Sequence, residues 1–345
     1  MEREPNMRFG PVPLDQALDA VSAHSLRLGE RVIKKGARLS ADDLTAIKAD
    51  GRDEVIVAIS DAGDIGEDEA AERLAIALSG PHIRRDQPTT GRNNLFADTA
   101  GVLRVNADAI NRLNAVDEAV TFATLPDFRA VERGEMIATV KIIPFAVSGA
   151  VIDKALFDAG TLPLIEVKPF RKLKVAAVST LLPGLKPSVI NKTLAVLEGR
   201  LAPADSTVDF DVRVAHDAHE VAQAIKASIT DGADLVVVYG ASAITDRRDV
   251  IPAAIELAGG RIEHFGMPVD PGNLMLVGEV EGRTVLGAPG CARSPKENGF
   301  DWVLQRVMAG IPVKRADLTG LGVGGLLMEI VQRGHPRDPN AGPQD

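Results

Sequence analysis

The chain has little of what would cross-link it, hold a metal or anchor it in a membrane. Cys291 is the one cysteine among 345 residues, so it cannot form an internal disulfide, and we expect the reducing cytoplasm as the compartment. Six histidines are scattered along the chain. His216 and His219 stand close together, and we interpret them as a polar helix start because other ligands are missing nearby. No apolar run approaches the ~18 residues of a membrane-spanning helix, and the first residues lack a signal-peptide core.

Aromatic residues are also scarce, and acidic residues outnumber basic ones. Aromatics make up 3% of the chain, so the 45% of hydrophobic residues must fill the core mainly as Val, Ile, Leu and Ala. The formal net charge of −9 argues against a nucleic-acid partner, whose phosphates need a basic surface. The length suits two soluble domains.

The C-terminal half alternates strand and helix patterns. The predicted strands are residues 173–178, 208–214 and 235–239, followed by a hairpin of 274–280 and 283–286 around Glu281-Gly282. The predicted helices are 189–198, 218–229, 250–258 and 300–308. This order predicts an α/β fold for residues 171–333, a three-layer α/β/α sandwich with a mostly parallel sheet. Residues 334–345 are rich in Pro, Gly and Asp and indicate a disordered tail or a linker.

The N-terminal half, residues 1–170, is interpreted as a smaller mixed α+β domain. Helices are expected at 13–21, 40–49 and 70–78, and strands at 54–59 and 138–145. Ser40 and Asp43 form the pattern of a capping box.

Three loops stand out because ligands of parallel sheets bind beyond the carboxyl ends of the strands. They are residues 179–186, 240–249 and 287–296. In the second, a buried strand runs into a small-residue loop and then a helix start, an arrangement that favours anions. Asp249 is placed as the N-cap of that helix.

Short motifs in and between these loops resemble the molybdopterin-binding domain shared by molybdopterin adenylyltransferases and molybdopterin molybdenumtransferases. Residues 247–252, RRDVIP, resemble its R-D-x-T-P signature, and residues 286–290, LGAPG, resemble a G-L-P-G-N-P loop. Residues 267–273, MPVDPGN, lie where those enzymes carry a Met/Arg-x-P-G-x-P stretch. The resemblance spans roughly residues 172–310. The chain departs from the pattern at 239–243, YGASA instead of T-G-G-T-G, and at Cys291-Ala292 instead of Asn-Pro.

The resemblance implies a site for a small phosphorylated pterin, molybdopterin, together with Mg²⁺. Asp246 and Asp249 are the candidate catalytic and metal-binding residues, and the alternative is a solvated turn residue and a helix cap. The candidate cofactor-binding residues are Ser179, Thr180, Gly184, Gly240, Ala241, Ser242, Arg247, Arg248, Pro289, Gly290, Arg293 and Ser294.

Each group also has a plain structural interpretation. One of Arg247 and Arg248 could grip a phosphate, or both could be solvated. The loop at 179–186 could be a simple connection, and the loop at 287–296 an ordinary strand-to-helix turn. Cys291 is interpreted as an inert thiol rather than a molybdenum ligand.

The sequence does not assign a function to two polar spots in the N-terminal half. They are Gly91-Arg92-Asn93-Asn94 and Lys141. Each could reach a ligand across a domain cleft or a dimer interface, or could satisfy turns and strand ends.

Three functions are compatible with the sequence. The first is a molybdopterin-binding enzyme of molybdenum cofactor biosynthesis that inserts molybdate. The second is a non-catalytic carrier or sensor of molybdopterin that works with a cofactor nucleotidyltransferase or a molybdoenzyme. The third is a nucleotide-handling enzyme of the competence-damage-inducible type. A homo-oligomer is expected, with no nucleic-acid or membrane partner.

Overall fold

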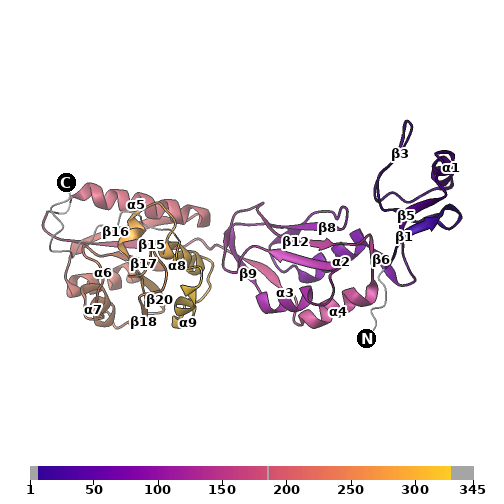
Figure 1. Ribbon diagram of the computed structural model, residues 1–345. Coiled ribbons are helices and arrows are strands. Elements are labelled where there is room, and N and C mark those ends of the chain that lie inside the picture. The colour runs from indigo at the N-terminus through magenta and orange to yellow at the C-terminus, as the bar shows by residue number, and fades with distance from the viewer. Residues whose placement is uncertain (1–6, 185, 328–345) are drawn as a thin grey trace, which may run out of the picture. The chain divides into compact units, whose positions relative to one another are not determined.

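The computed structural model describes residues 7–184 and 186–327 (Figure 1). The chain divides into two compact units, which we call unit 1 (Met1–Pro169) and unit 2 (Phe170–Asp345). Each unit mixes helices with strands, so the fold is α/β as the sequence predicts. The tail at 334–345 lies outside the described residues. In the described part of the chain, no helix combines the length and apolarity needed to cross a membrane.

Unit 2 is built on a six-stranded sheet of order β16-β15-β17-β20-β19-β18. Its strands are β15 (Lys174–Leu181), β16 (Thr207–Ala215), β17 (Leu235–Tyr239), β18 (Arg261–Phe265), β19 (Leu276–Val280) and β20 (Arg283–Ala288). The first four strands in the order pair in parallel, and β19 and β18 pair antiparallel. The sheet is therefore partly parallel, with an antiparallel end that includes the unpredicted strand β18.

Helices cover this sheet and bury a core on each face. They are α5 (Pro187–Leu201), α6 (Ala218–Thr230), α7 (Val250–Leu257), α8 (Gly299–Met308) and α9 (Arg315–Thr319). Along β15, Val175 and Ala177 pack in one core, which contains residues of α5 and α8. Ala176 and Val178 pack in the other, which contains residues of α6 and α7. Because successive side chains of a strand alternate between faces, burial on both faces requires the continuous apolar runs seen in the sequence.

The structure confirms the helix cap and the hairpin turn that the sequence predicts at the ends of these helices and strands. Asp249 caps α7, and its carboxylate accepts a hydrogen bond from the backbone N–H of Val250. The turn between β19 and β20 places Glu281 at φ 48° and Gly282 at φ 76°. Two successive positive φ values are what a two-residue hairpin turn needs, which explains the glycine.

Unit 1 contains several small sheets. Strands β1 (Arg8–Pro13), β5 (Glu54–Ile59) and β2 (Val21–Ser22) form one sheet in that order, and β3 (Leu26–Leu28) pairs with β4 (Arg31–Ile33). A four-stranded sheet has the order β10 (Val120–Thr124), β12 (Met136–Ile142), β8 (Arg92–Ala97) and β7 (Ile83–Arg85). Two others join β11 (Ala130–Val131), β9 (Gly101–Val105) and β14 (Ile165–Pro169), and β13 (Ala146–Ser148) with β6 (Asp64–Gly66).

The helices of unit 1 are α1 (Ala41–Ala49), α2 (Glu67–Leu78), α3 (Ala107–Asn114) and α4 (Gly149–Ala159). Helices α2, α3 and α4 pack with the four-stranded sheet in a core of Leu, Ile, Val and Ala. Ser40 and Asp43 form the predicted capping box at α1.

The helix predicted at residues 13–21 is wrong. A single 3₁₀ turn covers Leu14–Gln16, and the chain enters β2 at Val21. Asp19 adopts φ 63° and its N–H binds the carbonyl of Leu39. Contact with the segment before α1 therefore bends the chain where the local pattern favours a helix.

Candidate functional site

The three loops singled out in the sequence leave the sheet at the same edge. Strands β15, β17 and β20 are parallel neighbours, so their carboxyl ends lie together. The loops that follow these strands are part of the segments predicted to form the site. Their position agrees with the sequence analysis, and their role in binding stays a prediction.

Hydrogen bonds tie these loops to one another. The hydroxyl of Thr180, on β15, accepts the N–H of Ala241 at 2.7 Å. Arg293 donates to the carbonyl of Gly240 at 2.7 Å and to the hydroxyl of Thr193, on α5, at 3.2 Å. A Cβ atom at Gly240 would lie 2.6 Å from the carbonyl oxygen of Ser242, so the fold of this loop requires a glycine there.

His216, which the sequence analysis interpreted as part of a polar helix start, belongs to this edge. It follows β16, and its ring bridges two of the loops: Nδ1 lies 2.8 Å from the Thr180 hydroxyl and Nε2 lies 2.9 Å from the Ser242 hydroxyl. The arrangement fits an Nε2–H that donates to Ser242 while Nδ1 accepts from Thr180. The same carboxyl-end rule that selected the other loops would have selected His216, because β16 is parallel to β15.

On the α5 and α8 side of the sheet, two buried hydroxyls at this edge have unused hydrogen-bonding capacity. Ser179 and Tyr239 are partners across β15 and β17, and within the described residues neither hydroxyl has a hydrogen-bond partner. The guanidinium of Arg293 lies 5.5 Å from the centroid of the Tyr239 ring. Burial raises the pKa of the Tyr239 phenol and lowers the pKa of Arg293. Unpaired buried hydroxyls are costly, so this is a place where water or a ligand atom is stabilised.

The loop after β20 is held firmly by one ion pair. Arg200, on α5, binds the carboxylate of Asp301 with side chains 9% and 12% exposed. Its guanidinium also donates to the carbonyls of Ala292 at 2.8 Å and Ser294 at 2.7 Å. Removal of Arg200 would leave a carboxylate and two carbonyls without these partners, so the loop depends on it.

Asp246 and Asp249, the predicted metal ligands, are engaged in local hydrogen bonds. The Asp249 carboxylate accepts from the N–H of Val250 at 2.8 Å and of Thr245 at 3.1 Å. Asp246 accepts from the backbone and side chain of Arg248, and those bonds hold the pKa of its exposed carboxyl below the usual range. Among the residues with described positions, no group of three His, Cys, Asp or Glu side chains could hold a metal ion. Both carboxylates therefore have local structural roles, and magnesium binding by them stays a prediction.

The remaining candidates differ in exposure. Arg247 and Arg248 are exposed, and the Arg248 side chain is 91% accessible. Gly184 is exposed and adopts φ 88°. Pro289 is buried and Gly290 is exposed at the start of a 3₁₀ turn, Gly290–Arg293. Solvated arginines on a turn fit the plain interpretation, whereas half-buried Arg293 is anchored by several contacts.

Helices α5, α6 and α7 begin at this edge, and they differ in how their first N–H groups are satisfied. At α6 the Asp217 carboxylate accepts from the N–H groups of His219 and Glu220. Asp249 supplies a carboxylate to α7, as described above. At α5, Lys186 occupies the N-cap position and Pro187 is the first residue, and among the described residues no side chain caps the helix. The positive end of the α5 dipole therefore lacks a carboxylate of its own and has a lysine beside it, so it suits an anion better than α7 does.

Cys291 lies in the loop after β20 and is partly buried. Its Sγ is 3.7 Å from Oδ1 of Asn298. Burial raises the pKa of the thiol, which keeps it protonated at neutral pH. The side chain thus has the environment of an inert thiol.

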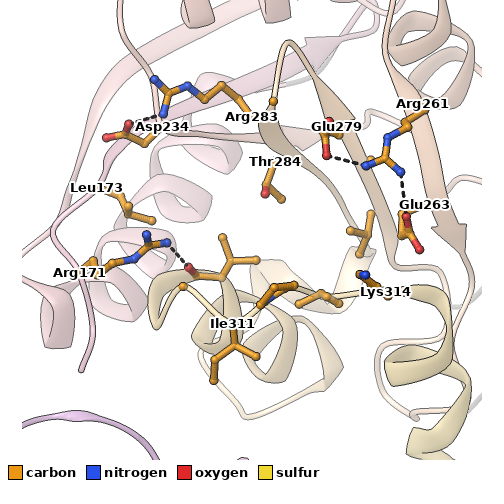
Figure 2. A pocket seen from close by; sticks show the side chains of 17 residues that line it. Arg171, Leu173, Asp234, Arg261, Glu263, Glu279, Arg283, Thr284, Ile311 and Lys314 are labelled. Atoms are coloured by element: carbon orange, nitrogen blue, oxygen red, sulfur yellow. Dashed lines mark hydrogen bonds and ion pairs between the residues drawn. The ribbon is translucent and has the colours of Figure 1, made fainter. Parts of the chain in front are cut away.

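A cavity of about 700 Å³ lies at the opposite edge of the same sheet, where β15, β17 and β20 begin (Figure 2). Arg283 pairs with Asp234 at 2.9 Å, and Arg261 pairs with both Glu263 and Glu279. These charges largely satisfy one another, and exposed pairs of this kind contribute little free energy. The sequence did not single out this cavity.

Comparison with known proteins leaves the family of this chain open. A domain of unknown function (DUF8806) matches residues 11–59. No curated protein matches the chain. A solved structure, the molybdopterin biosynthesis MoeA protein from Pyrococcus horikosii, is 14% identical, with a TM-score of 0.29. The match covers 92% of this chain and 77% of that one, at a level of similarity too low to support a functional argument.

Proposed function

We propose that this chain binds molybdopterin and serves molybdenum cofactor biosynthesis as a binding protein. The observation that carries the proposal is the junction of the loops after β15, β17 and β20 through Thr180, Ala241, Gly240 and Arg293. The sequence motifs that resemble the molybdopterin-binding domain lie in or beside these loops.

The anionic group of the ligand is best accommodated at the start of α5. That helix lacks a side-chain cap and has Lys186 at the N-cap position. Backbone N–H groups of a helix start, together with a cation, stabilise a phosphate.

Binding is favoured over molybdate insertion as the primary activity. The two carboxylates expected to hold magnesium are used by the Asp246–Asp249 turn and the cap of α7. A carrier or sensor needs no metal at this turn, because recognition of the pterin phosphate is enough. A cofactor nucleotidyltransferase or a molybdoenzyme would then receive the ligand, and molybdate insertion remains the second candidate.

Calorimetric titration with two matched ligands tests the proposal. One is molybdopterin in its stable oxidised phosphate form, and the other is the same pterin after phosphatase treatment. Charge-assisted bonds contribute about 1.5–3 kcal/mol each, so loss of the phosphate should weaken binding at least about tenfold. Equal affinity for the two ligands would contradict a phosphate site.

Two variants locate the site on the chain. Arg293→Lys keeps the charge but removes the fork that joins Gly240 and Thr193, and it should weaken binding of the phosphorylated pterin. Arg248→Lys is the matched control, since that side chain is 91% exposed and its ion pair among the described residues is a local one with Asp246. Equal effects of the two substitutions would remove Arg293 from the site.

Native mass spectrometry of protein from a host that makes the cofactor identifies the ligand directly. A retained pterin mass supports both the enzyme and the carrier. A retained nicotinamide or ADP-ribose compound would favour the competence-damage-inducible class. The same spectrum gives the number of chains in the particle, and turnover with ATP and molybdate separates enzyme from carrier.

A further inference from the structure

A cavity of about 530 Å³ within unit 1 is lined by both charged and apolar side chains. Charged side chains that line it are Lys35, Glu67 and Lys141, and large apolar ones include Phe9, Ile143 and Phe145. It shares no residue with the loops of unit 2, and its lining includes Lys141, a polar spot to which the sequence assigned no definite role.

Two of the charged residues, Lys141 and Glu67, are held in place by the loop before β8. Lys141 donates to the carbonyl of Thr90, and its Nζ lies 3.6 Å from Oε2 of Glu67. Gly91 is buried beside the pair: a Cβ atom there would lie 2.6 Å from Oε2 of Glu67 and 2.9 Å from Nζ of Lys141. Gly91 also adopts φ 70°, and its N–H binds the carboxylate of Asp68 at 2.6 Å. The backbone of Gly91 therefore packs directly against the ion pair. Only glycine fits this position, because a Cβ atom would collide with the pair.

The Lys141–Glu67 pair is partly removed from water. The two side chains are 29% and 21% exposed. Burial raises the pKa of Glu67, and the neighbouring charge of Lys141 opposes that rise. The two charges of the pair cancel. The pair can therefore orient a polar ligand group but adds no net charge to the cavity lining.

Lys35 adds a positive charge that no carboxylate of the lining balances. Its ammonium lies 5.7 Å from the centroid of the Phe145 ring. The lining itself therefore carries a surplus of one positive charge, on a chain whose formal net charge is −9, while the carboxylate of Asp68 acts on Glu67 from outside the lining. A ligand with one negative charge balances this surplus, whereas a dianion or an extended polyanion exceeds it.

Two of the large apolar residues of the lining are open to solvent. Phe9 and Ile143 keep 60% and 58% of their surface exposed. Large apolar side chains that border a hollow mark sites where an apolar ligand body gains free energy by leaving water. The exposed ring of Phe9 and the ring of Phe145 suit an aromatic group.

We propose that this cavity binds a small aromatic monoanion, with its ring against Phe9 and Phe145 and its negative group near Lys35 and Lys141. This site is independent of the proposed pterin site, because it lies in the other unit. A carboxylate and a sulfonate share the required chemistry.

Calorimetric titration of the full chain with 1-naphthoate tests the proposal, with uncharged 1-naphthamide as the comparison. Naphthoate should bind at least about tenfold more tightly, because an ammonium–carboxylate contact replaces a neutral one. Equal affinity, or no heat of binding for naphthoate at millimolar concentration, would overturn it.

Matched variants distinguish this cavity from general surface binding. Lys35→Met should abolish the preference for naphthoate, and Lys34→Met should keep it, because Lys34 is exposed and does not line the cavity. Phe9→Ser should weaken both ligands, whereas Phe157→Ser, at an 84% exposed residue of α4, should weaken neither. Equal effects within either pair would contradict binding here. Far-ultraviolet circular dichroism of each variant verifies the fold.

Discussion

Asp249 has two roles predicted from the sequence, a helix cap and a candidate metal ligand, and the structure confirms the cap. Its two oxygens accept from the N–H groups of Val250 and Thr245, which fixes both the start of α7 and the preceding loop. A residue that satisfies two backbone donors has a structural role whether or not it binds a metal.

Asp249→Ala should therefore cost about 1 kcal/mol of unfolding free energy, the usual value of a lost N-cap. Urea unfolding measures this cost. Asp246→Ala is the control: that side chain lies in an exposed turn, and its substitution should change stability less. If Asp249→Ala abolishes magnesium-dependent pterin binding while the fold survives, that result would support Asp249 as a metal ligand.

Cys291 permits a residue-scale test of burial. Because burial raises the pKa of its thiol, the native protein holds less thiolate at any given pH than the unfolded chain does. Ellman's reagent at pH 8 should react more slowly with native than with urea-unfolded protein, and the native rate should climb as pH rises. Equal rates in the two states would mean that the thiol is open to solvent.

At the scale of elements, glycine positions separate turns from helices. Gly282 occupies the left-handed region at φ 76° in the β19–β20 turn. Gly199 lies in α5, and its φ is not in that region. A Cβ atom at Gly199 would point into open space, with no atom outside its own helix turn within 4 Å.

Gly282→Ala should destabilise the protein by roughly 1–2 kcal/mol, because a Cβ atom is strained at this φ. Gly199→Ala should stabilise it by about 0.5–1 kcal/mol, since alanine loses less conformational entropy in a helix. Urea midpoints of the two variants should move in opposite directions. A shift of both in the same direction would contradict the turn assignment.

At the scale of the whole molecule, unit 1 and unit 2 have separate cores. Leu74, of α2, is fully buried in a core of unit 1, and Leu304, of α8, is buried in a core of unit 2. Trp302, also on α8, is the one tryptophan of the chain. Its fluorescence therefore reports on unit 2, whereas circular dichroism reports on both units.

Leu74→Ala should cost about 2–5 kcal/mol through the cavity it leaves, and should lower the urea midpoint of part of the circular dichroism signal. The fluorescence transition of Trp302 should stay where it was. Leu304→Ala should shift the fluorescence transition. If Leu74→Ala moves the fluorescence curve equally, the two units unfold as one.

The sequence by itself determined most elements of unit 2 and their order. Strand β17 is continuously apolar because it is buried on both faces, and Asp249 and Gly282 mark element ends through local hydrogen bonding and backbone conformation. Local rules suffice there because the cause of each structure lies within a few residues. They failed at residues 13–21, where the bond from Asp19 to Leu39 overrides the helical pattern.

Only the tertiary structure decided which polar groups meet. His216 joins Thr180 to Ser242, and Lys141 meets Glu67 beside Gly91, across separations that no local pattern records. Such contacts depend on strand order and on the packing of distant segments, which are set by the burial of whole faces rather than by neighbouring residues. For the same reason the sequence could place the candidate loops at one edge of a sheet, but could not show that Asp246 and Asp249 are occupied by their own turn.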